Sequence, residues 1–595
     1  MAVKISELEQ SIHAALETYS NVHRGSGYNA VITTKLFEQA RETVLEYLGL
    51  KKGEYIVIFC TRRRGERLTA HLPAGSFKGI SGKDLGLSIG VVALAVKKSE
   101  LPKGIPAESG GGTTKLISRN WVIWGDAPDR FEAGTPAIIN IIALARALQL
   151  VKQYGKESLR DPGAEKISVN DLLHNDKLDK FSGTELLAEL RKTLVGRGMR
   201  IPTKEGEKPF INFDNSASTR TFEPVWDAFR KTLNQPAEVQ KDIVRETKSV
   251  CAGFLNAPLS DYEVIFTSNT TEAINLAAES LGKEAGDGHE SVVVNTLLEH
   301  SSNDLPWRML SGNTLIRLSI SKEGFIDLNE LETLLREYNQ EEKHGKKRIR
   351  LVAVSGASNV LGSCNDIAAI SSIVHQYGAR LFVDGAQLVA HRRVDMQACN
   401  IDYLAFSAHK IYAPFGSGAL VVKKGLLRFD PDEMSRILDS GEENAAGIAA
   451  LGKSIILLER IGMEVIREDE QVLTAHALRG LAKVKGLQLF GVTDPASAAF
   501  PDKLGVFVFR MKGKMPNSVA KKLADQGGIG IRWGCHCSHI LVKHLLGLGP
   551  KLEQFQKILV TVFPMITLPG LARVSLGIEN TKEEVDCLVE TLGKL

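Results

Sequence analysis

Two patterns of hydrophobic and polar positions alternate along this chain: short apolar runs, and longer stretches with apolar residues at helical spacing. Apolar runs at 292–294, 351–354 and 381–383 predict buried strands. The stretch 367–375 has the spacing of a helix, and the stretch 448–464 predicts a single long helix. Strands that alternate with helices in this way are typical of an α/β protein with a mostly parallel sheet and right-handed crossovers.

Polar side chains follow two of the predicted strands. Asp384 and Gln387 follow one, and Ser407, His409 and Lys410 follow another. Open α/β sheets bind ligands at the carboxyl ends of their strands, so we expect these five side chains to meet at one edge. They suit pyridoxal phosphate. Lys410 would bind the aldehyde, Asp384 would keep the pyridine nitrogen protonated, and Gln387 would bond the ring hydroxyl. Ser407 and His409 would reach the phosphate.

Spacing alone fits an Asp-Gly turn and a solvated lysine as well as it fits a cofactor site. However, ValAspGlyAlaGln (383–387) followed by SerAlaHisLys (407–410) resembles the cofactor signature of the class V aminotransferase family of fold-type I enzymes, and of its cysteine desulfurases in particular. The resemblance is strong over about residues 185–595 and weak over 20–150. It implies an α/β fold of the PLP-dependent transferase type I, with a mostly parallel central sheet flanked by helices and a smaller α+β carboxyl-terminal domain.

Further segments match this family. ThrSerAsnThrThrGlu (267–272) predicts a capped helix whose first turn contains Thr270 and Thr271 and would bind the phosphate. By the resemblance, His300 stacks on the cofactor ring and moves protons during the reaction. Asn359 corresponds to a residue that contacts the ring oxygen in relatives.

The carboxyl-terminal part carries the features that decide the chemistry. ArgTrpGlyCysHisCys (532–537) resembles the desulfurase pattern Arg-x-Gly-x-x-Cys, which makes Cys537 the nucleophile and not Cys535. Arg532 and His536 would favour its thiolate form. Cysteines and histidines at 535–539 also permit a metal interpretation. No second ligand pair is evident, so we expect no metal.

Between the cysteine and the next family motif, the sequence departs from the desulfurases. Residues 538–572 are interpreted as a helical insertion that could bury or reposition Cys537. After it, Arg573 lies in a segment that matches the family's substrate-carboxylate motif. Its guanidinium would make a two-pronged contact with the substrate.

The first 160 residues repeat features of the later part. The paired segments, in the same order, are 55–60 with 263–267, 91–98 with 418–424, and 132–139 with 439–446. Such an order favours an internal duplication. Lys83 only loosely takes the place of Lys410, and no strand with an acid and an amide precedes it. We interpret this part as a degenerate, non-catalytic copy.

The two copies are complementary in a pair of family motifs. Relatives have a HisArgGly segment near the start and a GlyThrPro turn that reaches the cofactor phosphate of the neighbouring subunit. Here the first copy has both, at 23–25 and 134–136, whereas the second has GlyGluGlu at 441–443. We hypothesise that the copies form a pseudo-dimer in which Thr135 completes the phosphate site. The alternative is that GlyThrPro only starts a helix.

Length and composition support several soluble globular domains, with 595 residues, 43% hydrophobic and 24% charged. The expected parts are a degenerate module (1–160), a linker helix and connector (161–208), a large cofactor-binding domain (209–445) and a small domain (446–595). A net charge of +4 and basic clusters without aromatic residues predict no nucleic-acid partner. Seven scattered cysteines and the absence of a long apolar run or signal peptide predict a cytoplasmic protein without a membrane partner.

The combined expectation is a pyridoxal-phosphate cysteine desulfurase. It would convert L-cysteine to L-alanine, place the sulfur on Cys537 as a persulfide, and deliver it to a sulfur-acceptor protein. One alternative is a carbon–sulfur lyase, epimerase or aminotransferase in which Cys537 is structural. Another is a scaffold relative without turnover. The chain would work as an intrachain pseudo-dimer or as a homodimer.

Overall fold

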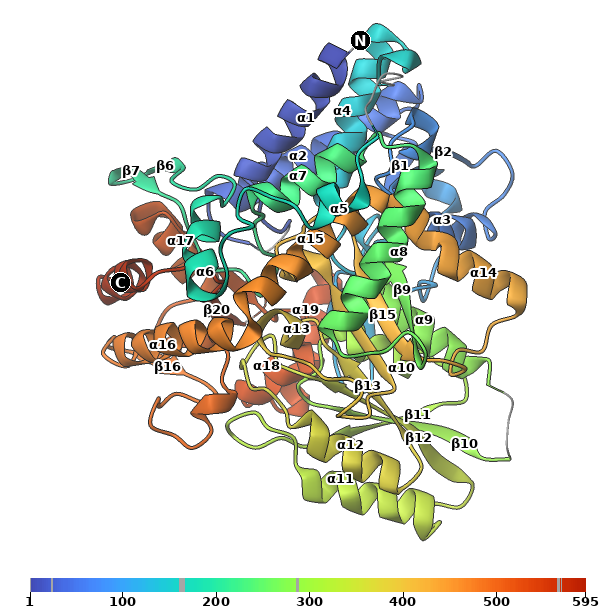
Figure 1. The fold of residues 1–595 in the computed structure, drawn as a ribbon. Helices are drawn as coiled ribbons and strands as arrows, with labels where there is room; N and C mark the ends of the chain where they lie inside the picture. Colours follow the sequence, from blue (N-terminus) through green and yellow to red (C-terminus); the bar gives the residue numbers. More distant parts are fainter. Residues whose placement is uncertain (1, 23–24, 160–165, 285–287, 564–567, 569) are drawn as a thin grey trace.

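The computed structural model describes residues 2–22, 25–159, 166–284, 288–563, 568 and 570–595 (Figure 1). Its central element is a seven-stranded sheet with the order β11-β10-β12-β13-β14-β15-β9. The strands are β9 (Tyr262–Thr267), β10 (Glu290–Thr296), β11 (Thr314–Leu318), β12 (Lys347–Ser355), β13 (Arg380–Asp384), β14 (Tyr403–Ser407) and β15 (Gly418–Lys423). Pairings from β11 to β14 are parallel, and β15 is antiparallel to both neighbours. The predicted α/β class with a mostly parallel sheet is confirmed.

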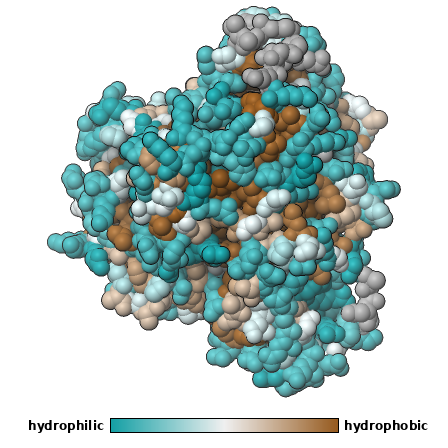
Figure 2. All heavy atoms as spheres, viewed as in Figure 1, coloured by the Kyte–Doolittle hydropathy of each residue, from teal (hydrophilic) through white to brown (hydrophobic). Residues whose placement is uncertain are grey.

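The apolar runs form strands that are buried on both faces. In β10, Val292 and Val294 pack into the largest core cluster, while Val293 packs into a separate cluster on the other face. In β12, Val352 packs into the largest cluster and Leu351 into the cluster on the other face. Successive side chains of a strand point to opposite faces, so a sheet covered on both sides needs an unbroken apolar run. Figure 2 shows that the viewed face of the molecule is mostly hydrophilic, with hydrophobic residues in separate areas.

Helices before, between and after these strands complete the large domain. They are α7 (Glu223–Thr232), α8 (Ala237–Phe254), α9 (Thr270–Gly282), α10 (Leu305–Arg308), α11 (Leu328–Leu335), α12 (Ile367–Gln376), α13 (Leu388–His391), α14 (Pro431–Asp439) and α15 (Ala445–Ile461). Helix α15 packs against α7 and α8. A single helix over 448–464 is a wrong prediction, because α15 ends at Ile461 and α16 (Met463–Leu481) begins after Gly462. Gly462 has a φ of 88°, which is outside the helical region.

The small domain is built on a second sheet. Its antiparallel order is β16-β17-β20-β19, with β16 (Leu487–Leu489), β17 (Val506–Met511), β19 (Arg532–Gly534) and β20 (Leu571–Ser575). Helices α16, α17 (Pro516–Gly527) and α20 (Lys582–Gly593) accompany it, and α16, α17 and the C-terminus lie on the left of Figure 1. The predicted insertion is helical, with α18 (His539–Leu545) and α19 (Pro550–Val562). A short parallel pair, β8 (Ile211–Asn212) with β18 (Ile529–Gly530), links this domain to the start of the large one.

The first part of the chain contains a small antiparallel sheet with the order β1-β3-β2. Its elements are α1 (Ala2–Glu17), α2 (Tyr28–Tyr47), β1 (Tyr55–Cys60), α3 (Arg62–Thr69), β2 (Phe77–Ser81), β3 (Val92–Lys97), β4 (Thr114–Ile117), β5 (Val122–Trp124) and α4 (Ile138–Tyr154). The order of these three strands matches that of β9, β15 and β14, which are also antiparallel. Its interpretation as a degenerate copy stays a prediction. Lys83 is exposed in a 3₁₀ turn after β2.

A connector joins the two parts. It contains α5 (Val169–Leu173), α6 (Gly183–Lys192) and a hairpin of β6 (Arg200–Thr203) and β7 (Gly206–Pro209). Within the described ranges, none of the helices combines the length and the apolar character needed to cross a bilayer.

Candidate active site

A cavity of about 310 Å³ lies where the carboxyl edge of the seven-stranded sheet meets the small domain. Every site residue predicted from the sequence lies in its wall, namely Thr270, Thr271, His300, Asn359, Asp384, Gln387, Ser407, His409, Lys410, Cys537 and Arg573. The first nine come from the large domain, whereas Cys537 and Arg573 follow or belong to β19 and β20. The wall also contains residues of the first part of the chain, such as Gly111 and Thr135, so three parts of the chain enclose one polar cavity.

Strand β13 ends at the acid Asp384, and the amine of Lys410 lies in the turn that follows β14. Asp384 is the last residue of β13, and its Oδ1 accepts a hydrogen bond of 3.0 Å from the Ala386 N–H. Gln387 donates from Nε2 to the Ser216 carbonyl oxygen at 2.8 Å. Burial lowers the pKa of the Lys410 amine to about 8, an effect that Asp384 opposes and Arg573 reinforces. Lys410 can therefore lose its proton far more easily than an exposed lysine.

His409 faces the cavity as a neutral ring. Burial, together with the nearby Lys410 and His300, lowers its pKa to about 3. Its Nδ1 lies 3.2 Å from the Ser218 hydroxyl, which in turn lies 2.7 Å from the Tyr19 hydroxyl of the first part. The imidazole is thus held by hydrogen bonds and carries no charge near neutral pH.

The start of α9 collects donors for an anion. Asn269 caps this helix, as predicted, by accepting the Glu272 N–H at 3.0 Å. In a complete capping box, the Glu272 carboxylate would in return accept the Asn269 N–H. Here it accepts the N–H of the preceding residue, Ser268, at 2.7 Å. Ser407 Oγ lies 2.7 Å from both the N–H and the hydroxyl of Thr270. Hydroxyls and N–H groups at the positive end of a helix dipole favour a phosphate.

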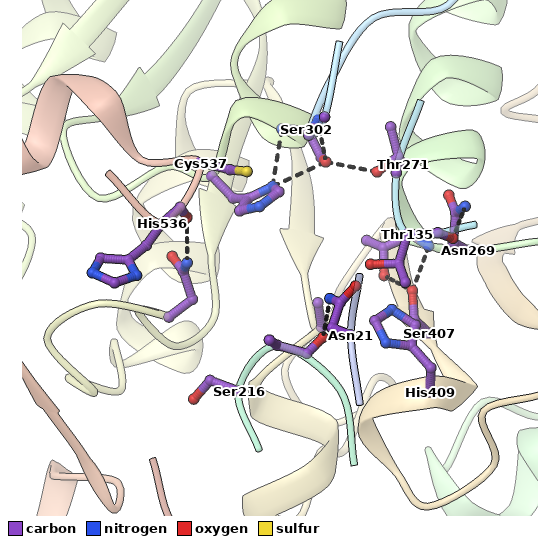
Figure 3. A pocket seen from close by; sticks show the side chains of 18 of the residues that line it. Asn21, Thr135, Ser216, Asn269, Thr271, Ser302, Ser407, His409, His536 and Cys537 are labelled. Carbon is purple, nitrogen blue, oxygen red and sulfur yellow. Dashed lines mark hydrogen bonds between the residues drawn. The ribbon is translucent and has the colours of Figure 1, made fainter. Parts of the chain in front are cut away.

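The first part of the chain closes this end of the cavity. Asn269 donates from Nδ2 to the Thr135 carbonyl oxygen at 3.1 Å. Gly134 has a φ of 86°, and a Cβ there would lie 2.6 Å from Asn269 Oδ1, so only glycine permits this approach. Figure 3 shows Thr135, Asn269 and Ser407 grouped on one side of the cavity and Cys537 and His536 on the other. His23 and Arg24 of the HisArgGly motif lie outside the described residues.

His300 is oriented by a serine that the sequence analysis did not single out. The Ser302 N–H donates to His300 Nδ1 at 3.2 Å, so Nδ1 is the acceptor and a neutral ring carries its proton on Nε2. The Ser302 hydroxyl lies 2.6 Å from the Thr271 hydroxyl and accepts from the Gly111 N–H at 3.2 Å. Ser302 therefore links the histidine, the α9 turn and the first part of the chain.

Asp214 is a second residue that the sequence analysis left without a role. Its carboxylate lies 2.9 Å from NH2 of Arg573 and 2.9 Å from Nε of Arg532. Burial lowers the pKa of Arg573, which is only 2% exposed, and Asp214 opposes this change. NH1 of Arg573 donates to the Asn359 carbonyl oxygen, while its buried Nε has no hydrogen-bond partner among the described residues. This Nε is suited to an incoming carboxylate.

Cys537 occupies a clamped turn. Both His536 and Cys537 have positive φ, at 52° and 54°. Such left-handed conformations cost about 1–3 kcal/mol each outside glycine, so neighbouring contacts must hold them. Ser301 N–H donates to the Cys537 carbonyl oxygen at 2.7 Å, and Asn359 Nδ2 donates to that of His536 at 3.0 Å. The insertion does not remove Cys537 from the cavity, and the residue remains partly exposed.

Two cations of the cavity interact with the sulfur. Cys537 raises the pKa of both Lys410 and Arg573, which means that both positive charges can stabilise a thiolate. Arg532 lines the same cavity and forms an ion pair with Asp214, and its effect on the thiolate stays a prediction. Across the described residues, no three His, Cys, Asp or Glu side chains are grouped so that they could hold a metal ion.

Comparisons with known proteins agree with this geometry. The family model described as Aminotransferase class-V matches residues 80–192 and 211–588. A cysteine desulfurase of Cronobacter sakazakii (strain ATCC BAA-894) is 33% identical over 387 residues, which is 61% of this chain and 84% of that protein. The corresponding protein of Dickeya dadantii (strain 3937) is 32% identical over 422 residues, covering 65% and 92%.

Solved structures share the fold. An apo cysteine desulfurase from Thermococcus onnurineus NA1 superimposes with a TM-score of 0.55 at 24% identity, covering 70% of this chain and 99% of that one. A cysteine desulfurase from Escherichia coli gives a TM-score of 0.54 at 23% identity, covering 69% and 98%.

Proposed function

This chain belongs to the aminotransferase class-V family, and from this premise we propose that it is a cysteine desulfurase that uses pyridoxal phosphate. The observation that carries the proposal is the meeting of Lys410, Arg573 and Cys537 in one cavity. An amine for the cofactor, a cation for the substrate carboxylate and a thiol for the substrate sulfur are the groups that this reaction requires. Sulfide and alanine formed together from L-cysteine would test it.

The donor set fits the cofactor. Asp384 offers a buried carboxylate for the pyridine nitrogen, and Gln387 offers an amide for the ring hydroxyl. The Thr270 and Thr271 turn offers hydroxyls at a helix N-terminus for the phosphate. When bound, pyridoxal phosphate supplies an aldehyde for an amine and a ring that withdraws electrons from the substrate.

The protein side chains then have distinct roles. Lys410 would hold the cofactor through its amine and, as a free amine, would move a proton at the α-carbon of the substrate. Arg573 orients the substrate carboxylate through its guanidinium. His300, whose Nδ1 accepts the Ser302 N–H, would stack on the ring and donate a proton from Nε2 into the cavity.

The sulfur step involves Cys537 alone among the cysteines. Its thiolate attacks the substrate sulfur, a sulfur–sulfur bond forms, and the carbon–sulfur bond breaks with its electron pair left on carbon. Protonation of that carbon gives alanine, and Cys537 keeps the extra sulfur as a persulfide. L-cysteine and one thiol become L-alanine and one persulfide, so no external oxidant or reductant is needed. An acceptor thiol, which we place on a partner protein, would then remove the sulfur.

Incorporation of the cofactor should depend on pH through the Lys410 amine. Its pKa is lowered from 10.5 to about 8, and only the neutral amine can attack an aldehyde. We expect the incorporation rate into cofactor-free protein to fall about tenfold per pH unit below about 8 and to level off above it. Stopped-flow absorbance measures this rate. A profile that levels off only near 10.5 would contradict the assignment.

We also propose that the first part of the chain takes the place of a second subunit. Reciprocal contacts support this idea. A Cβ on Gly416 would lie 2.4 Å from the Cβ of Ala137, and one on Gly90 would lie 2.6 Å from that of Asn444. In the sequence repeats, Gly90 aligns with Gly416 and Ala137 with Asn444. Each glycine therefore contacts, in the other copy, the residue aligned with the one that contacts its own counterpart. Such reciprocal contacts are typical of a two-fold interface.

Replacement of Thr135 by alanine should therefore weaken cofactor binding. A lost hydrogen bond to a charged phosphate corresponds to a rise in the dissociation constant of about tenfold or more. Equilibrium titration of cofactor-free protein measures it. Thr43→Ala, at a partly exposed position of α2 outside the cavity wall, is the matched control. Equal affinities of Thr135→Ala and wild type would leave GlyThrPro as a helix-starting turn only.

A further inference from the structure

A second cavity, of about 200 Å³, lies within the first part of the chain. It opens beside α3 on the face of β1 that carries Ile58, and the segment 102–108 forms its other side. None of the residues in its wall also lines the active-site cavity. The two cavities are therefore separate.

The polar part of this cavity is a buried pair of opposite charges. Glu108 and Arg64 have side chains only 7% and 10% exposed, and Arg64 Nε lies 2.5 Å from Glu108 Oε2. Even so, both carboxylate oxygens of Glu108 and NH2 of Arg64 are buried without a hydrogen bond among the described residues. Buried charged groups with unfilled hydrogen-bonding capacity are costly, so a ligand that supplies both a donor and an acceptor would be favoured.

The rest of the wall is mostly apolar. Ile58, Leu68, Ile105 and Phe131 contribute to it, beside the polar side chains of Arg67 and His71. The volume is below the range of about 300–1,000 Å³ typical of sites for drug-sized ligands, which limits the occupant to a small molecule. The cavity therefore combines a small apolar space with one buried pair of an acid and a guanidinium.

We propose that this cavity binds a free α-amino acid with a compact apolar side chain. The ligand ammonium pairs with Glu108, its carboxylate takes the open NH2 of Arg64, and its side chain fills the apolar space. Arg67 NH1 lies 4.0 Å from Glu108 but only 2.9 Å from Glu279, so its charge is already paired and Arg64 is the guanidinium that meets the ligand. A ligand with only an acid or only an amine leaves one member of the pair unsatisfied, so the zwitterion is preferred.

Contacts with α9 connect this site to the phosphate end of the active site. Arg64 Nε also lies 3.8 Å from Glu272, in the first turn of α9. Ser109, which follows Glu108, donates from its N–H to Asn275 of the same helix at 3.1 Å. The Arg64–Glu272 ion pair therefore joins the proposed amino-acid site to the first turn of α9, where we propose that the phosphate binds.

Isothermal titration calorimetry of the full-length, cofactor-loaded protein with L-leucine tests the proposal. We expect saturable binding, and binding at least about tenfold weaker for isocaproate and for isoamylamine, which each lack one charge. Ala107→Trp places a large side chain at the exposed rim of the cavity and should abolish binding without touching the ion pair. Ala498→Trp, at an exposed position of the small domain, should leave it unchanged.

Two results would overturn the proposal. One is the absence of saturable heat with L-leucine at millimolar concentration. The other is equal binding to wild type and Ala107→Trp, accompanied by a change in cofactor absorbance, which would place the leucine in the active-site cavity. Neither result bears on desulfurase activity, which is measured with L-cysteine.

Discussion

Lys410→Ala should reduce turnover of L-cysteine by at least about a thousandfold. General acid–base catalysis alone contributes roughly 10²–10⁴-fold, and this variant also loses the covalent attachment of the cofactor. The cavity offers no second amine as a substitute, because the other lysine in its wall, Lys115, forms an ion pair with Asp126 at 2.6 Å. Initial rates of alanine formation measure the effect.

A matched control separates this effect from a general loss of structure. Lys424→Ala removes an exposed lysine just beyond β15 and should leave the rate unchanged. After borohydride reduction, peptide mass spectrometry should find the cofactor on Lys410 in wild type and in Lys424→Ala only. Substantial turnover by Lys410→Ala, or labelling of another lysine, would show that the assignment of the amine is wrong.

Cys537→Ala should abolish the release of sulfide and alanine from L-cysteine while the protein still binds its cofactor. The expected loss is about a thousandfold, since the nucleophile that takes the sulfur is gone and the carbon–sulfur bond has no alternative acceptor. Cys537 is not among the residues that we propose bind the cofactor, so the absorbance of the bound cofactor should persist. Alanine and sulfide are assayed together.

Cys535→Ala provides the control for Cys537. Cys535 is partly buried against the main core and is absent from the cavity wall, so its removal should keep most of the activity. Mass spectrometry of wild type after one turnover should find the extra sulfur on the peptide at Cys537. Full activity of Cys537→Ala would instead make this residue structural and would favour a lyase.

Much of the site could be predicted because its signals are local. Asp384 and Lys410 follow apolar runs that only a strand buried on both faces would need, so their place at the sheet edge followed from the sequence. Asn269 caps α9 through a bond to a residue three positions away. Interactions this short leave a recognisable pattern in the sequence.

The roles that the sequence did not reveal depend on contacts between residues that are far apart in the chain. Asp214 meets Arg573 from 359 positions away, and no local pattern marks a carboxylate as the partner of a particular arginine. Ser302 acquires its role only because Gly111 and Thr271 lie beside it in the folded chain. The break at Gly462 was missed for a different reason: apolar residues continue at helical spacing on both sides, and a single glycine carried the stop signal.

Anaerobic incubation of the purified, cofactor-loaded protein with L-cysteine tests the central claim most directly, with sulfide and alanine quantified in the same samples. A desulfurase should form alanine and, after reduction of the persulfide, an equal amount of sulfide, and both should depend on Lys410 and Cys537. Sulfide accompanied by pyruvate, or no consumption of L-cysteine, would contradict the claim and leave Cys537 as a residue held in the cavity wall without a role in sulfur transfer.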